Sequence, residues 1–577
     1  MAGLITKHKI IDPKNKEIAS KYNFNPEAIS EIFQELHRLN GWLDKKSIED
    51  VAILLGIPSH QAYGVASFYS MFFLQETPDK VIRICDGPVC WLFGAQRIKQ
   101  KVRIELHNKS WKVDRTSCLG LCDLAPAGLI NKVQYGPVTK ENLPPNLEKI
   151  NYKINFYSNA HPGEIRVMMK NAGAVDPFSI ESALENGSYN ALKKSVEQAP
   201  AWIIDEIEKS GLSGRGGAGF PVGRKWRFVA DNPQTPKYII CNADESEPLN
   251  FKDRVLIETN PQQLLEGMAI AGYSTGASVG YIYIRGEYDY QANLLENAID
   301  QAVSSKLLGD NIYGSGFSFH IHIHRGSGAY ICGEETALIE SMEGKRGEPR
   351  LRPPYPPQVG FRAKPTLVNN VESYCAVPSI ILNGPDWYKA LSSYSHPGTK
   401  MFSVLGHIKQ PGIFEAPFGI TLRQIIDEFG GGMKEGSNFK FALTGGAAGT
   451  IVPESLLDVP IDYSSVNDGV SIGAGGILIC DQTVSVISLL REILYFFKVE
   501  SCGKCTPCRV GTDRSYEILS RLTERNGTGA DIDELITLAE YMQNSSFCGL
   551  GQSVVMPVQT AVKHFRSEFE AALSNHV

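Results

Sequence analysis

Two groups of closely spaced cysteines constrain this chain more than any other feature of its sequence. The chain has 577 residues and only 12 cysteines, and eight of these fall into the two groups. So few cysteines in so long a chain do not make a disulfide framework, and clustered spacing in a reducing compartment indicates metal binding. The other four stand alone in apolar surroundings and are predicted to pack in cores: Cys241, Cys332, Cys375 and Cys480.

The first group has the spacings C-x4-C and C-x3-C and consists of Cys85, Cys90, Cys118 and Cys122. Four thiolates on two glycine-containing loops suit a [2Fe–2S] cluster, in which each iron takes two sulfurs and loop amides bond to the sulfides. A structural zinc held by four cysteines is the alternative, although zinc sites usually use tighter C-x2-C pairs.

The second group has the spacing C-x2-C-x2-C, and its fourth member follows about forty residues later: Cys502, Cys505, Cys508 and Cys548. Three cysteines at this spacing can each ligate one iron of a cubane, while the fourth iron takes the remote ligand. Zinc needs no third cysteine at that spacing. The pattern therefore predicts a [4Fe–4S] cluster.

Charge and hydropathy narrow the function classes. A formal net charge of -6 and a pI near 6.1 argue against nucleic-acid binding, which requires a basic stripe. The sequence shows neither a secretory leader nor a run of 18 apolar residues, so we expect a cytoplasmic protein with no membrane span. An apolar content of 43% suffices for several buried cores.

A glycine-rich stretch, residues 214–219, predicts a pocket for an anionic group. Glycines let the backbone approach a phosphate closely and direct successive N–H donors toward it. The stretch lies in a segment where strands and helices alternate, which predicts an α/β sheet with ligands at the carboxyl ends of its strands. Asn242–Glu245 ends one strand, and Gly333–Glu335 forms a turn further on, so both are expected at the same pocket.

Several smaller patterns complete the organisation. Residues 20–74 have the apolar spacing of a small helical unit, with helix starts at Asn25-Pro26, Ser47 and Ser59. His320, His322 and His324 alternate along one strand and predict a polar face, with a metal tract as the alternative.

Residues 350–357 are proline-rich and are expected to form an ordered wall of the pocket. Residues 400–479 contain no cluster of reactive groups, which favours a spacer or docking role, and the first helix after Val484 is expected to end at Phe497.

These motifs together resemble a known family. Gly214–Pro221, Cys241–Glu245, Tyr330–Thr336, Asn369–Glu372 and the Cys502 group are similar to the flavoprotein subunit of respiratory complex I, over about residues 155–577. The four-cysteine group upstream, with Cys118–Pro126, resembles the small thioredoxin-like [2Fe–2S] subunit of the same complex. Their fusion in one chain resembles the diaphorase flavoprotein subunit of soluble NAD-reducing [NiFe] hydrogenases and, less closely, a subunit of NAD-dependent formate dehydrogenases.

The resemblance implies a multidomain α/β and α+β fold. The expected parts are a helical unit (1–77), a thioredoxin-like [2Fe–2S] domain (78–154), a Rossmann-like FMN- and NAD(H)-binding α/β domain (155–397), a ubiquitin-like β-grasp domain of the soluble-ligand-binding kind (398–482) and a helical bundle with a [4Fe–4S] cluster (483–577). A linker is expected near Pro144-Pro145.

The resemblance also implies the site residues. FMN is expected to contact Gly214, Arg215, Gly216, Gly217, Lys225, Asn242, Asp244, Glu245, Tyr330, Gly333, Glu334, Asn369 and Asn370. NAD(H) is expected beside Phe220, Lys225, Phe228, Glu247, Glu335, Arg352 and Tyr355, of which Arg352 and Tyr355 stand where complex I relatives tend to have lysine and phenylalanine. Alternatively, the glutamates of these motifs begin helices and interact with the helix macrodipole.

The implied chemistry is direct hydride transfer between nicotinamide and FMN, with no catalytic side chain, followed by single-electron exchange with the clusters. Glu335 is expected to accept from the adenosine 2′-hydroxyl and to repel a 2′-phosphate, which favours NAD over NADP. The expected partners are an iron–sulfur electron-transfer subunit and [NiFe] hydrogenase subunits. A formate dehydrogenase, a complex I peripheral arm and a cluster-bearing scaffold without turnover are the alternatives.

Overall fold

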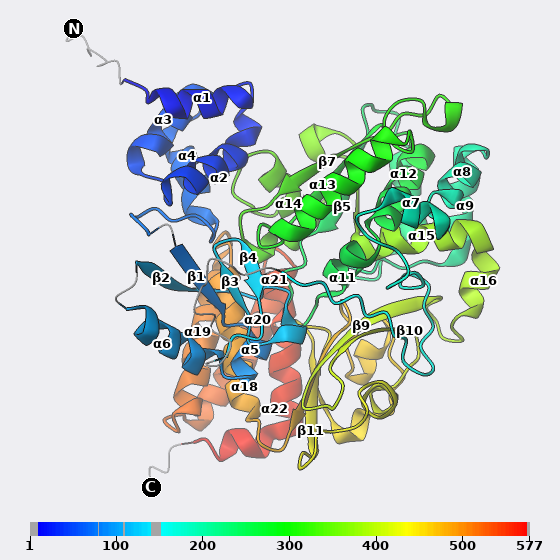
Figure 1. Ribbon diagram of the computed structural model, residues 1–577. Helices are drawn as coiled ribbons and strands as arrows, with labels where there is room; N and C mark the ends of the chain where they lie inside the picture. Colours follow the sequence, from blue (N-terminus) through cyan, green and yellow to red (C-terminus); the bar gives the residue numbers. More distant parts are fainter. Residues whose placement is uncertain (1–9, 79, 108–109, 140–151, 574–577) are drawn as a thin grey trace.

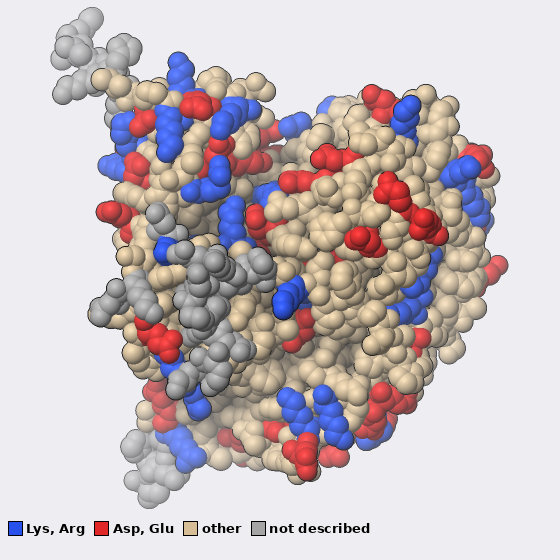
Figure 2. Space-filling model, viewed as in Figure 1, with Lys and Arg blue, Asp and Glu red and all other residues tan. Residues whose placement is uncertain are grey.

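A computed structural model describes residues 10–78, 80–107, 110–139 and 152–573, and the predicted linker at Pro144-Pro145 lies outside them. Three sheets organise the described chain, each in a different part of the molecule (Figure 1). Helices of the C-terminal part stand beside the first and the last of these sheets (Figure 1). Acidic and basic side chains are interspersed over the face shown in Figure 2. None of the described helices is long and apolar enough to cross a membrane.

The N-terminal helical unit contains α1 (Pro13–Lys21), α2 (Ile29–Asn40), α3 (Lys45–Leu55) and α4 (Ser59–Phe68). The expected helix start at Ser47 was two residues late, because Asp44 caps α3 by accepting a hydrogen bond from the Ser47 amide. Helix α1 was not predicted, although its signal is present: Asp12 caps it and Pro13 occupies its first position. Ile32, Phe33 and Leu36 of α2 are fully buried in the core of the unit.

The helical unit packs against the edge strand of the central sheet, β7 (His320–Arg325). The Ser30 and Ser327 hydroxyls lie 3.0 Å apart, and Gln34 donates to the carbonyl of Arg325 at 2.9 Å. His324 is buried, with its Nδ1 3.1 Å from Glu31 Oε1, whereas His320 pairs with Asp310. The alternating histidines therefore serve the packing of this strand and its surface contacts.

The first cysteine group lies on a four-stranded sheet of order β2-β1-β3-β4. Its elements are β1 (Lys80–Cys85), α5 (Pro88–Leu92), α6 (Ala95–Leu106), β2 (Trp111–Thr116), β3 (Gly128–Ile130) and β4 (Val133–Tyr135). Strands β1 and β2 run parallel, and helices α5 and α6 lie between them in the chain. Both strands therefore end at the same edge, where Cys85 closes β1 and Cys118 follows β2.

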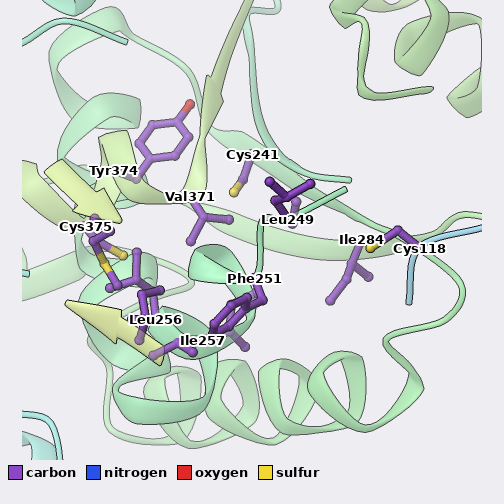
Figure 3. Close-up of a cluster of buried hydrophobic side chains, with 14 of the residues drawn as sticks. Cys118, Cys241, Leu249, Phe251, Leu256, Ile257, Ile284, Val371, Tyr374 and Cys375 are labelled. Atoms are coloured by element: carbon purple, nitrogen blue, oxygen red, sulfur yellow. The ribbon is translucent and has the colours of Figure 1, made fainter. Parts of the chain in front are cut away.

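The central sheet is parallel throughout, with order β7-β6-β5-β8. Its other strands are β5 (Tyr238–Ala243), β6 (Val279–Ile284) and β8 (Thr366–Asn370), and the helices around it include α9 (Pro200–Ser210), α10 (Val222–Ala230), α11 (Lys252–Thr259), α12 (Pro261–Thr275), α13 (Asp289–Ser304), α14 (Glu335–Met342) and α15 (Val371–Asn383). Asn242 of β5 pairs in register with Asn370 of β8. Figure 3 shows Cys241 and Cys375 in the core here, and Cys332 and Cys480 are equally buried, which confirms the predicted packing role of the four isolated cysteines.

Residues 399–481 form a five-stranded sheet of order β10-β9-β13-β11-β12. Its strands are β9 (Thr399–Gly406), β10 (Gly412–Pro417), β11 (Phe439–Thr444), β12 (Thr450–Pro453) and β13 (Gly476–Asp481). Strands β9 and β13 pair in parallel, and the other pairs are antiparallel. The unit also contains α17 (Leu422–Gln424), which continues as a π-helical turn to Phe429 and begins with a Thr421–Gln424 capping box. We call this part the β-grasp unit.

The C-terminal helices are α18 (Val486–Glu500), α19 (Thr506–Thr523), α20 (Gly529–Ser545), α21 (Gly549–Ser553) and α22 (Val555–Glu570). Helix α18 does not end at Phe497 as expected but continues to Glu500. The last turn is stabilised by tertiary contacts, because the Glu500 carboxylate accepts hydrogen bonds from the Tyr330 amide at 2.9 Å and from the Ser117 hydroxyl.

Two buried arginines join the first cysteine group to the central sheet. Arg254 of α11 donates to the carbonyl of Gly120 at 2.9 Å and to Asp123 Oδ1 at 2.7 Å. Arg285, which follows β6, donates to the carbonyls of Cys118 and Glu245. Because both guanidinium groups are fully buried and paired, the loop that carries Cys118 and Cys122 is fixed relative to the carboxyl end of the central sheet.

Candidate functional site

A pocket of about 850 Å³ opens at the carboxyl ends of β5 and β8. Its lining includes the following predicted FMN and NAD(H) contacts: Gly214, Gly216, Phe220, Lys225, Phe228, Asn242, Gly333, Glu334, Glu335, Arg352, Tyr355, Asn369 and Asn370. The proline-rich segment contributes Arg352, Tyr355 and Pro357, as expected for a wall of the pocket. The volume falls within the usual range for ligand pockets.

The glycine loop is held between this pocket and the β-grasp unit. Gly219 has φ +68°, and a Cβ there would lie 2.8 Å from Cγ of the Tyr463 ring, so only glycine fits. The Tyr463 hydroxyl donates to the carbonyl of Gly214 at 2.8 Å. On the other side, a Cβ at Gly216 would lie 3.4 Å from Cβ of Asn370. The β-grasp unit, expected to be a spacer or docking part, therefore supports the pocket from behind.

Other predicted contacts lie outside the lining of the pocket. The Arg215 side chain is fully buried and faces away from it. Its guanidinium donates to Tyr388 Oη at 2.8 Å and lies over the ring of Phe418 at 4.6 Å. Only its backbone faces Ser373, which does line the pocket. Gly217 packs instead against Gly473 and Ala474 of the β-grasp unit.

Of the two acidic residues after β5, Glu245 is buried and Asp244 is partly buried, and neither lines the pocket. Glu245 begins helix α11 by accepting from the amides of Asp253 at 2.9 Å and Arg254 at 3.1 Å, which is the helix-start role given as the alternative. Asp244 accepts from the Ser246 hydroxyl. Burial raises the pKa of both carboxyl groups to about 7.

Glu247 and Tyr330 form a partly buried pair beside the β-grasp unit. The Tyr330 hydroxyl donates to Glu247 Oε2, and the Ala448 amide donates to Glu247 Oε1 at 3.1 Å. Burial raises the pKa of Glu247. The Tyr330 ring meets the edge of Phe496 on α18 at 4.9 Å between ring centroids. Neither residue lines the pocket, and both join it to the units around it.

Charged and aromatic side chains gather at the mouth of the pocket. Glu335 lies between two cations, with Oε2 3.4 Å from Lys225 Nζ and Oε1 3.6 Å from Arg352 Nη1. The rings of Phe220, Phe228 and Tyr355 are 43%, 47% and 50% exposed. Exposed ring faces beside ion-paired cations suit a ligand that carries both aromatic rings and phosphates.

Buried polar atoms without partners show where a ligand fits. Asn369 Nδ2 and Glu334 Oε1 are both buried at the pocket without a hydrogen-bond partner, and Glu334 Oε1 lies 3.5 Å from Arg352 Nη1 as an ion pair. Such groups are costly unless something pairs with them. The hydroxyl, carbonyl and N–H groups of FMN can pair with an amide donor and a carboxylate acceptor, so the pocket fits this cofactor. The other oxygen of Glu334 caps α14 by accepting from the Thr336 and Ala337 amides.

Asn370, the neighbour of Asn369, is satisfied within the protein. Its Oδ1 accepts from Lys252 Nζ at 2.9 Å and from the Glu372 amide at 3.1 Å. Its Nδ2 donates to Asp253 Oδ2 at 2.7 Å and to the Asn242 carbonyl at 3.3 Å. An amide side chain has two donors and two acceptor sites, and all are used here. The sequence did not distinguish the two asparagines.

The first cysteine group converges on one buried place. Cys118 Sγ and Cys122 Sγ lie 3.5 Å apart, and all four thiols are buried. The Gly120 amide points at Cys118 Sγ and the Ala127 amide at Cys90 Sγ, each at 3.4 Å. Backbone amides directed at sulfur atoms are the contacts that tune a cluster.

The second group lines a single cavity, together with Ile331, Lys504, Phe547 and Leu550. Cys505 and Cys548 occupy the N-cap positions of α19 and α21, so both helices begin at a cysteine that lines the cavity. Among the residues that the structure describes, no three histidine, cysteine or acidic side chains converge on a single metal ion. An iron–sulfur cluster needs no such convergence, because each of its irons takes only one or two of the four thiolates.

One short turn joins this cavity to the pocket. The 3-10 helix η4 covers Tyr330–Gly333. Ile331 lines the cavity of the second cysteine group, and Gly333 lines the pocket at the sheet. The two sites are therefore neighbours across four residues of backbone.

The fold and these sites define the class of the protein: an iron–sulfur flavoprotein oxidoreductase. Four family models match the chain. They describe a thioredoxin-like [2Fe-2S] ferredoxin (residues 15–151), the Nuo51 FMN-binding domain (207–379), an SLBB domain (401–450) and the NADH-ubiquinone oxidoreductase-F iron-sulfur binding region (488–572).

Two relatives agree with this class. The chain is 46% identical over 409 residues to the NADP-reducing hydrogenase subunit HndC of Solidesulfovibrio fructosivorans, covering 71% of this chain and 83% of that protein. It is 42% identical over 407 residues to the F 2 subunit of NADH-quinone oxidoreductase from Rhizobium meliloti, covering 70% of this chain and 97% of that protein. The chain belongs to the family that comprises the F subunits of NADH-quinone oxidoreductase and related hydrogenase subunits.

A solved structure matches nearly the full length. The crystal structure of NAD+-reducing [NiFe]-hydrogenase in the H2-reduced state contains a chain that superposes with a TM-score of 0.83 and 29% sequence identity. The match covers 96% of this chain and 93% of that one. A match of this length includes the N-terminal helical and [2Fe–2S] parts as well as the flavin-binding part.

The two asparagines give the first prediction. Asn369→Ala removes an unpaired donor from the pocket, so we expect FMN to bind about three- to tenfold more weakly, with little change in thermal stability. Asn370→Ala instead leaves Lys252 and Asp253 short of partners, and we expect the free energy of unfolding to fall by roughly 1–3 kcal/mol. FMN titration of the depleted protein and thermal denaturation measure the two effects. Equal loss of FMN affinity and stability in both variants would contradict the distinction.

Proposed function

We propose that this chain oxidises NADH or reduces NAD+ as the flavoprotein subunit of a multi-subunit oxidoreductase. FMN, when bound, supplies the step from two-electron nicotinamide chemistry to one-electron transfer. The observation that supports the proposal most directly is the turn η4, because it places the pocket next to the cavity of the second cysteine group.

The chain's own residues bind and orient the reactants. The glycine loop and Lys225 suit a phosphate, and the Asn369 and Glu334 atoms that lack hydrogen-bond partners suit the hydroxyl and ring-edge groups of FMN. Phe220, Phe228 and Tyr355 offer exposed ring faces to the nicotinamide nucleotide. The proposed chemistry asks no side chain to act as acid, base or nucleophile, because the residues of the pocket would only bind the two ring systems and hold them together.

The two cysteine groups take different roles in this proposal. The second group, Cys502, Cys505, Cys508 and Cys548, would hold the [4Fe–4S] cluster, which supplies one-electron transfer when bound, and its cavity adjoins the pocket. The first group, Cys85, Cys90, Cys118 and Cys122, holds the [2Fe–2S] cluster, which serves as a side acceptor or store.

A test separates hydride transfer from electron delivery. Cys502→Ala removes one thiolate of the second group, so we expect NADH still to reduce bound FMN while electron delivery to a partner or a one-electron acceptor stops. Stopped-flow absorbance of the flavin and steady-state acceptor reduction measure the two steps. Cys480→Ala, which changes a buried thiol in the β-grasp core, is the matched control and should retain both. Failure of flavin reduction in a folded, FMN-replete Cys502→Ala protein would contradict this division of roles.

The nucleotide preference depends on Glu335 in this proposal. Its carboxylate would accept from a 2′-hydroxyl and repel a 2′-phosphate, so NAD is preferred. Lys225 and Arg352, each within 3.6 Å of Glu335, would attract a phosphate once that negative charge is gone. A relative from Solidesulfovibrio is named as NADP-reducing, so nucleotide preference has to be measured for this chain rather than inferred from its relatives.

Glu335→Gln is therefore expected to lower the ratio of kcat/KM for NADH over NADPH by about tenfold or more, which corresponds to roughly 1.4 kcal/mol. Initial rates with an artificial acceptor measure this ratio. Glu340→Gln on the same helix α14 is a matched control, since Glu340 pairs with Arg350 and Lys345 outside the pocket. An unchanged ratio in Glu335→Gln would rule out the assignment.

The proposed partners are an iron–sulfur electron-transfer subunit and [NiFe] hydrogenase subunits in a cytoplasmic hetero-oligomer. The support is that the solved hydrogenase chain matches 96% of this chain, the [2Fe–2S] part included. The peripheral arm of a quinone-reducing complex is the second candidate, favoured by the relatives named as F subunits of NADH-quinone oxidoreductase, which match 68–73% of the chain. A formate dehydrogenase stays an alternative from the sequence.

Purification of the tagged chain from its native cells, followed by subunit identification and metal analysis, decides between these partners. We expect nickel and a [NiFe] subunit to co-purify in fixed ratio with the chain. Molybdenum in their place would indicate a formate dehydrogenase, and recovery with quinone-reducing membrane subunits would indicate a peripheral arm. Either result would overturn the hydrogenase assignment while leaving the flavin chemistry in place.

A further inference from the structure

Lys400 of the β-grasp unit is buried in the interior of the protein, where it contacts the helix that follows the pocket strand β8. Lys400, on β9, is 0% exposed. Its ammonium group donates to Glu372 Oε2, and the amide of Met401, the next residue, donates to Glu372 Oε1 at 3.0 Å. Glu372 lies in the first turn of α15, directly after the pocket residues Asn369 and Asn370. Strand β9 therefore binds the first turn of α15 through two contacts to Glu372.

The contact continues from Glu372 to the wall of the pocket. The same oxygen, Glu372 Oε2, lies 3.3 Å from Lys252 Nζ. Lys252 in turn donates to Asn370 Oδ1 at 2.9 Å and to Asp253 Oδ1 at 2.6 Å. Asn370 backs Gly216 of the glycine loop and is itself part of the pocket lining. A continuous chain of contacts thus runs from Lys400 through Glu372 and Lys252 to Asn370.

The charges of this network balance only when all of its members are present. Lys252, Asp253, Glu372 and Lys400 are at most 2% exposed, so two ammonium groups neutralise two carboxylates away from water. Burial lowers the pKa of Lys400 to about 8, although Glu372 opposes that effect. Removing one member of such a network leaves an uncompensated buried charge, to which its neighbours must respond. Lys252 is the neighbour of Glu372 that can shift in response, and its other partners are Asn370 and Asp253.

We propose that Lys400 is a positioning residue of the flavin pocket, which acts through Glu372 and Lys252 on Asn370 and the glycine loop. This inference rests on the proposed binding of FMN. It gives the β-grasp unit a role in cofactor binding, in addition to the support that Tyr463 gives to the loop. Because coupling between two sites is reciprocal, FMN in the pocket must also stabilise the packing of β9.

The test measures FMN affinity of the full-length, FMN-depleted chain. Lys400→Met keeps the length of the side chain and removes its charge, and we expect the Kd for FMN to rise about tenfold. Lys440→Met is the matched control: Lys440 is another β-grasp lysine, which pairs with Glu568 on α22, and its Kd should stay within about twofold of wild type. If wild type itself fails to bind FMN, the proposed function fails. If wild type binds and Lys400→Met binds equally well, the positioning role fails.

A second measurement separates positioning from a general loss of stability. In a cycle with Glu372→Gln, the double variant should bind FMN no more weakly than the weaker single variant, since both changes break the same path. The proposal would be overturned if the increase in Kd of the double variant equalled the product of the increases in the two single variants. The double variant also removes both charges together, so its Kd for FMN can be compared with that of wild type if Lys400→Met does not fold.

Hydrogen exchange gives a readout that does not depend on turnover. FMN should slow exchange of the β9 amides in wild type and in Lys440→Met. In Lys400→Met that slowing should be lost, while FMN still protects the amides of the glycine loop. Equal protection of β9 in all three proteins would overturn the proposal.

Discussion

The parallel pairing of β5 with its neighbours is the constraint on which the rest of the structure depends. Because β5 lies between β6 and β8 with all strands in one direction, the segments that follow each strand meet at one edge. The pairing of Asn242 with Asn370 sets the two pocket walls opposite each other. Every other functional part is placed by a contact to this edge: the glycine loop, the two cysteine groups and the β-grasp unit.

Those contacts are unusually often buried charges. Arg254 and Arg285 hold the loop of Cys118 and Cys122, Glu500 joins that loop region to Tyr330, and Lys400 joins the β-grasp unit to α15. Apolar packing alone would permit small sliding of one unit over another. A hydrogen bond made by a buried charged group is directional, and losing its partner leaves a buried charge unpaired, so such contacts favour one relative placement. Electron transfer between separate centres requires that kind of fixed placement.

The sequence predicted the chemistry of the sites better than the direction of individual side chains. Both cysteine groups and the glycine loop could be read from local spacing, because their chemistry requires that spacing. The direction of the Arg215 side chain could not be predicted in this way, because it is set by Tyr388 and Phe418, which are far away in the chain. The same holds for Asn370, whose donors and acceptors are used by Lys252 and Asp253. The extra turn of α18 depends likewise on distant partners of Glu500. Reading the β-grasp unit as a spacer failed to foresee Tyr463 and Lys400 because each is an isolated residue with no motif around it.

The turn η4 has a consequence for how this protein can change over time. Within its four residues, Gly333 lines the pocket and Ile331 lines the cavity of the second cysteine group. An insertion or deletion there would disturb both sites at once. The C-terminal helices are therefore not an interchangeable module: a chimera that imports them from a relative has to import the matching Tyr330–Gly333 turn as well, and the two halves have to evolve together.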